Sequence, residues 1–149
     1  MALVIEGEVG IGKTALWKQG LSAASNRSYH VLACRPNDAE AQLAYAALGD
    51  LLAEVPDVVL AELPGPQRRA LEVALLRAEP EERQSLPRAV PLGLLEVLRA
   101  LARQGPTVVG IDDAQWLPAS RNWCATALRC LLRPPERRHR SPRRCRVPP

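Results

Sequence analysis

The segment at residues 7–14 constrains the fold of this chain most strongly, because its glycines, lysine and threonine stand at a fixed spacing. Its sequence, Gly-Glu-Val-Gly-Ile-Gly-Lys-Thr, satisfies the pattern Gly-x-x-x-x-Gly-Lys-[Ser/Thr] of a phosphate-binding loop. Glycines let the backbone turn its amides inward, and a Cβ at those points would collide with phosphate oxygens. The residues predicted to surround the phosphates are Gly7, Glu8, Val9, Gly10, Ile11, Gly12, Lys13 and Thr14.

The last two residues of this loop have separate chemical roles. Lys13 brings a flexible point charge to the outer phosphates, and Thr14 can offer its hydroxyl to a magnesium ion. The helix that begins there adds its free amides and the positive end of its dipole to the same anion. The loop therefore predicts a site for a nucleotide and Mg²⁺.

An ordinary strand-to-helix connection is the alternative, since a short pattern with several free positions also occurs by chance. Residues 2–5 form a continuous apolar run with Val and Ile, which predicts a buried strand. Residues 15–24 place Trp17, Leu21 and Ala24 on one helical face. A phosphate-binding loop is credible only between a strand and a helix, and both flanking patterns are present.

A second chemical landmark lies at residues 107–116, Thr-Val-Val-Gly-Ile-Asp-Asp-Ala-Gln-Trp. An unbroken apolar run is typical of a strand covered on both faces in a parallel sheet, and ligands bind where such strands end. Asp112 can hold a magnesium ion there, opposite the phosphate loop. Taken alone, an acidic pair at a strand end more often caps a turn or the next helix. Together with the upstream loop, the pair favours a metal site.

The remaining segments predict further elements around these two motifs. Residues 29–34 form a β-prone run, and residues 40–55 carry apolar side chains at helical spacing up to Pro56. The prolines that follow are expected to cut the chain into short helical pieces, of which residues 67–78 are the clearest. These prolines stand at positions 64, 66, 80, 87 and 91. A stronger helix, ended by the Gly-Pro pair 105–106, is defined by Leu94, Val97, Leu98 and Leu101. The predicted fold is α/β, a parallel sheet of the P-loop NTPase type flanked by helices.

The formal charge of +4 is unevenly distributed along the 149 residues. Residues 133–149 carry seven arginines and one acidic side chain, a charge of +6, whereas residues 1–132 carry 13 basic and 15 acidic side chains, a charge of −2. This asymmetry predicts one domain over residues 1–132 and a basic, disordered tail over residues 133–149. Non-specific nucleic acid is a candidate partner of such a tail.

Other classes of protein are not supported by the composition. The four cysteines form no Cys-x-x-Cys pair, and His30 and His139 have no ligand spacing to them, so neither a zinc site nor a disulfide framework is predicted. The apolar run at the start is too short for a signal peptide or a membrane span. The expectation is a cytoplasmic protein without a membrane partner.

Together these motifs resemble the nucleotide-binding domain of the large LuxR-type transcriptional regulators, which are related to MalT and belong to the STAND branch of the AAA-like ATPases. The resemblance spans about residues 3–117 and rests on the segments 6–16, 67–76 and 111–117. The loop motif is common to many ATPases and GTPases, whereas Asp-Asp-Ala-Gln-Trp in the third segment is fairly specific to this group.

The resemblance implies roles for individual residues. Lys13 and Thr14 would bind the phosphates and magnesium of ATP, Asp112 would coordinate the magnesium, and Asp113 would take the catalytic position of the water-polarising acid. Because Asp113 is shorter than the glutamate often found at that position, the protein is expected to be at most a weak ATPase. The implied activity is Mg²⁺-dependent ATP binding by a switch module. The alternative is a non-enzymatic fragment that associates with nucleic acid through its arginine-rich tail.

Several parts of the family pattern have no counterpart in this sequence. They are a segment ahead of the first strand, the sensor strand, the helical lid, the regulatory repeats and the DNA-binding helix-turn-helix. The chain is therefore expected to be a truncated fragment, with a shifted reading frame in its last thirty residues, and DNA would be bound only through regions that it lacks. The sensor strand should lie between the two site strands, yet its place falls in residues 138–149, whose prolines and arginines cannot fill a central strand. The sheet is thus expected to be incomplete.

Overall fold

Within the residues that the computed structural model describes, 3–40, 43, 45–79 and 86–117, the sheet consists of two parallel strands. These are β1 (His30–Cys34) and β2 (Thr107–Ile111), with His30 opposite Thr107 and Cys34 opposite Ile111. Their Val, Ile and Leu side chains suit a pleated surface that is covered on both faces. The strands predicted around residues 29–34 and 107–111 are confirmed.

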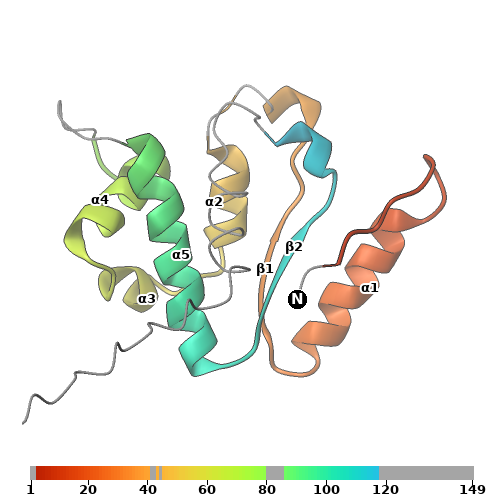
Figure 1. Cartoon of the computed structure of the whole chain (residues 1–149), viewed down its shortest axis with the longest axis horizontal. Helices are drawn as coiled ribbons and strands as arrows, with labels where there is room; N and C mark the ends of the chain where they lie inside the picture. The colour runs from red at the N-terminus through yellow and green to blue at the C-terminus, as the bar shows by residue number, and fades with distance from the viewer. Residues whose placement is uncertain (1–2, 41–42, 44, 80–85, 118–149) are drawn as a thin grey trace, which may run out of the picture.

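Helices lie on both sides of this sheet (Figure 1). On one side α1 (Lys13–Ser25) contacts both strands, and on the other α2 (Ala46–Leu52) contacts β1 while α5 (Leu86–Gln104) contacts β2. The other elements are α3 (Asp57–Ala61), α4 (Gly65–Ala74) and two short 3-10 helices, η1 (Asp38–Glu40) and η2 (Ala114–Trp116). The arrangement is an incomplete α/β fold of the P-loop NTPase type, as predicted.

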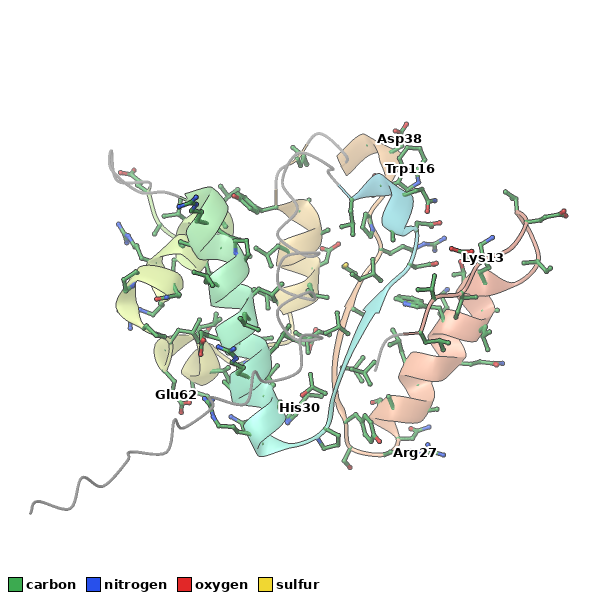
Figure 2. The ribbon with its side chains drawn as sticks, viewed as in Figure 1. Lys13, Arg27, His30, Asp38, Glu62 and Trp116 are labelled. Carbon is green, nitrogen blue, oxygen red and sulfur yellow. The ribbon has the colours of Figure 1, made fainter. Side chains whose placement is uncertain are left out.

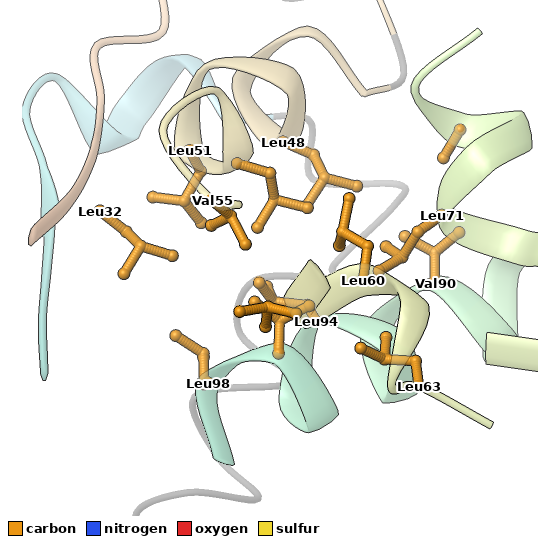
Figure 3. Packing of buried hydrophobic residues seen from close by; sticks show 14 of the residues in the cluster. Leu32, Leu48, Leu51, Val55, Leu60, Leu63, Leu71, Val90, Leu94 and Leu98 are labelled. Atoms are coloured by element: carbon orange, nitrogen blue, oxygen red, sulfur yellow. The ribbon is translucent and has the colours of Figure 1, made fainter. Parts of the chain in front are cut away.

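The main hydrophobic core lies between the sheet and the helices α2 to α5 (Figure 3). Its largest fully buried side chains are Leu48, Leu51, Leu52, Val59, Leu71, Val90, Leu94 and Val97. The chain contains no Phe, so this core is packed by branched aliphatic side chains. The four residues predicted to form the apolar face of α5 are all buried, which confirms that face.

The apolar run at the N-terminus behaves differently from its prediction. Residues 3–5 are not part of the sheet, and Leu3 and Val4 are 82% and 75% exposed. The predicted strand is therefore wrong for the part of this run that the structure describes. The physical reason is that a strand requires a neighbour that pairs with its amides and carbonyls, and among the described residues β2 pairs only with β1. Residues 138–149, which the family order would place beside β2, lie outside the described ranges.

Three helix predictions need correction. Of the helix predicted over residues 40–55, the described residues form only α2, and residues 41, 42 and 44 lie outside the described ranges. The helix predicted over residues 67–78 begins earlier and ends at Ala74, beyond which Leu76 adopts a left-handed φ of 58°. Pro91 does not interrupt a helix, as was predicted, but lies inside α5. The loss of one helical hydrogen bond at Pro91 is offset because Val90 and Leu94 on either side of it are fully buried in the core.

Two further expectations concern the chain as a whole. The basic segment at residues 133–149 lies outside the described residues, so its disorder and its nucleic-acid binding remain predictions. Over the ranges that the structure covers, no helix combines the length and the apolar character needed to cross a membrane.

Candidate functional site

The glycine-rich segment leads directly into the N-terminus of α1 (Figure 2). Gly10 and Gly12 have left-handed φ angles of 85° and 98°, which residues other than glycine rarely adopt. The first helical hydrogen bond of α1 runs from Leu16 N to Gly12 O at 3.0 Å. The amides of residues 13–15 precede that bond and therefore have no partner within the helix. A turn of this kind presents amides and the positive end of a helix dipole to an anion.

Lys13 folds back onto the loop that precedes it. Its Nζ donates hydrogen bonds to the carbonyl oxygens of Gly7 and Glu8, both at 2.8 Å. The ammonium group is thus held beside the N-terminus of α1. The charge of the lysine and the positive end of the helix dipole therefore add to the positive potential at this place. Thr14 follows in the first turn of α1 and is half-buried.

Asp112 extends the end of β2 by one residue. Its amide donates to the carbonyl oxygen of Cys34 at 3.2 Å, so the backbone pairing of the two strands continues into the acid pair. The residue is only 8% exposed, and its Oδ2 has no hydrogen-bond partner among the described residues. A buried carboxylate oxygen in this condition is costly unless a cation or a donor compensates it.

Asp113 has a more open environment and stronger polar contacts. Its backbone is left-handed, with φ 51° and ψ 43°, and its side chain makes no capping hydrogen bond to η2. Instead, Oδ1 accepts a hydrogen bond from Gln115 Nε2 at 3.1 Å, and Oδ2 accepts one from Arg35 Nε at 3.4 Å.

Packing of α1 against the sheet brings the two motifs to the same end of the molecule. A Cβ added to Gly110 would lie 2.7 Å from Leu21 Cδ2 and 3.0 Å from Trp17 Nε1, so α1 packs closely on β2 at that glycine. Lys13 is about one helical turn, roughly 6 Å, before Trp17, and Asp112 is two strand residues, roughly 7 Å, beyond Gly110. Because α1 runs antiparallel to β2 (Figure 1), both steps lead toward the carboxyl edge of the sheet.

Figure 2 shows the outcome of this packing. Lys13 and Trp116, which follows the acid pair in η2, lie at one end of the molecule, and Arg27 lies at the opposite end. The structure therefore brings the phosphate loop and the acid pair to one edge. Residues 7–12 form the exposed outer part of that edge.

Arg35 is a member of this edge that the sequence patterns did not single out. Its Nε lies 3.4 Å from Oδ2 of Asp112 and 3.4 Å from Oδ2 of Asp113. The register of the strands explains the contact, because Cys34 lies opposite Ile111 and the next residues of the two strands are therefore neighbours. If the two predicted strands had been paired in parallel at the sequence level, the residues that follow them, Arg35 and Asp112, would have been expected to be neighbours.

The residues present fit a nucleotide phosphate with its magnesium ion. The open glycine turn and the unpaired helix amides suit the phosphates, and the buried Asp112 oxygen without a hydrogen-bond donor suits a metal ion. In the described ranges no group of three or more His, Cys, Asp and Glu side chains comes together. Mg²⁺ is compatible with such a sparse set, since it is commonly bound by one or two carboxylates together with phosphates and water.

Comparison with known proteins agrees with this chemistry. The family model described as the AAA ATPase domain matches residues 1–143, nearly the whole chain. No curated protein and no solved structure matches the sequence. On the strength of that match and of the loop and acid-pair geometry, the chain belongs to the AAA ATPase domain family, whose members bind nucleotides.

Proposed function

We propose that this chain binds ATP together with Mg²⁺ and acts as the nucleotide-dependent switch module of a LuxR-type transcriptional regulator. The observation that carries the proposal is that packing of α1 on β2 places the Lys13 loop and the buried acid Asp112 at the same end of the sheet. Family membership supports nucleotide binding, and the resemblance of the acid-pair segment supports the regulator assignment.

Different residues at this edge would bind the phosphates and the metal ion. Lys13 would exchange its bonds to the Gly7 and Glu8 carbonyls for bonds to the outer phosphates, and the amides of residues 13–15 would face the same anion. Thr14 and Asp112 would hold Mg²⁺, which supplies neutralising charge to the phosphates when bound. Asp113 would orient a water molecule, although its contacts with Arg35 and Gln115 already engage both carboxylate oxygens.

The Asp112→Asn variant tests the metal role. The amide has nearly the same shape as the carboxylate but lacks its charge, and it leaves the loop amides and Lys13 unchanged. We expect the Mg²⁺ concentration needed for half-maximal binding of a fluorescent ATP analogue to rise about tenfold or more, with little change in affinity without Mg²⁺. Superimposable Mg²⁺ titrations of the two proteins would show that Asp112 is structural.

Hydrolysis is expected to be slow even where ATP is bound. Asp113 is short for a water-polarising acid, and its carboxylate accepts hydrogen bonds from Arg35 and Gln115, which lower its availability as a base. Phosphate release measured under saturating Mg²⁺ and ATP should stay well below about 1 per second. Turnover at or above that rate would contradict the assignment as a binding switch.

A further inference from the structure

The contact between Arg35 and the acid pair results directly from the strand register. Arg35 follows the last residue of β1 and Asp112 follows the last residue of β2, and the amide of Asp112 continues the ladder to Cys34. The guanidinium therefore lies at the carboxyl edge of the sheet. Its Nε is 3.4 Å from one oxygen of each aspartate.

The two aspartates do not benefit equally from this arginine. Nε carries a single hydrogen, and it is donated to Asp113 Oδ2. Asp112 Oδ2 lies at the same distance but accepts no hydrogen bond within the described residues, although its side chain is nine-tenths buried. Arg35 thus balances the charge of Asp112 without satisfying its oxygen. The Asp112 oxygen therefore remains a buried acceptor without a donor, which indicates that another ligand binds it more favourably than Arg35 does.

We propose that Arg35 is the internal counter-cation of the acid pair and competes with a divalent metal ion for Asp112. The inference rests on the proposed function, in which that aspartate holds Mg²⁺. Arg35 would set the metal concentration at which the site fills, because the guanidinium and the metal ion are both attracted to the negative charge of the Asp112 carboxylate.

Charge and exposure make this exchange feasible. A divalent ion has twice the charge of a guanidinium and needs no aligned N–H to bind the free oxygen of Asp112. If Arg35 stayed 3.4 Å from that oxygen, its positive charge would lie next to the positive metal ion. Metal binding therefore disfavours the contact between Arg35 and Asp112. About half of the Arg35 side chain is exposed, and its contacts are long for charge-assisted hydrogen bonds. The guanidinium can therefore move into solvent at low cost.

The test measures binding of Mn²⁺, as a spectroscopic substitute for Mg²⁺, to the full chain without nucleotide. Free Mn²⁺ is followed by electron paramagnetic resonance. Arg35→Ala should lower the half-saturating Mn²⁺ concentration about tenfold. Arg35→Gln, which keeps most of the side-chain volume without the charge, should act in the same direction, and Arg35→Lys should stay close to the wild type. Arg27→Ala is the matched control, since Arg27 is an exposed arginine at the opposite end of the molecule (Figure 2), and it should change nothing.

The gain in Mn²⁺ affinity must depend on Asp112. Adding Asp112→Asn to Arg35→Ala should abolish it. Equal half-saturation for the wild type and both neutral Arg35 variants, including absence of binding in all three, would overturn the proposal, as would a gain that survives Asp112→Asn. Failure of the wild type to bind ATP would instead contradict the proposed function, and the nucleotide-free Mn²⁺ result would stand apart from it.

Discussion

Replacement of Lys13 by alanine is expected to lower the affinity for ATP at least about 100-fold, and in a standard titration to abolish binding. The side chain holds its ammonium beside the loop through two 2.8 Å hydrogen bonds to Gly7 and Glu8, in position to reach a phosphate. Loss of a charged partner of a phosphate costs about 3 kcal/mol, which corresponds to about two orders of magnitude in the dissociation constant. Titration with a fluorescent ATP analogue measures the change directly.

The fold should tolerate this substitution. Lys13 is not among the buried core residues, and its two hydrogen bonds are made to exposed loop carbonyls, so the free energy of unfolding should change by less than about 1 kcal/mol. Lys18→Ala is the matched control, because Lys18 is an exposed lysine on the same helix, and its ATP affinity should equal that of the wild type. Equal ATP affinity for Lys13→Ala and Lys18→Ala would refute the phosphate role of the loop.

Replacement of Gly93 by alanine is expected to reduce the free energy of unfolding by about 2–3 kcal/mol. Gly93 is buried where α5 crosses α4, and a Cβ there would lie 2.8 Å from Leu71 Cγ and 3.1 Å from the backbone oxygen of Gln67. The first of these is a branch point of a fully buried side chain and the second belongs to the backbone, so neither can move away easily. A thermal melt should show a midpoint about 5–10 °C lower.

Gly20→Ala provides a control with the opposite sign. Gly20 lies in α1, and a Cβ there meets no atom within 4 Å, so alanine should raise stability by up to about 1 kcal/mol through its higher helix propensity. In the double variant Gly93→Ala with Leu71→Ala the two losses should not add, since removal of the Leu71 side chain makes room for the new methyl group. A Gly93→Ala protein as stable as Gly20→Ala would show that α4 and α5 can separate at no cost.

Local patterns were sufficient for much of the fold. Short β-prone runs located β1 and β2, and the spacing of Leu94, Val97, Leu98 and Leu101 located the buried face of α5, because these features depend on the pattern within a single segment. The same patterns misplaced helix ends. Burial of the residues around Pro91 preserved a helix that a local proline rule would have interrupted.

The sequence by itself determined the chemistry available at the edge of the sheet, since the loop at residues 7–14 and the pair Asp112–Asp113 are visible as motifs. Only the tertiary structure decided which of the apolar runs pair as strands, because pairing depends on a neighbour and not on the run itself, and residues 3–5 remain outside the sheet. It also brought Arg35 to the acid pair. Arg35 and Asp113 are 78 residues apart in the chain, and they meet because parallel pairing of β1 with β2 aligns the carboxyl ends of both strands.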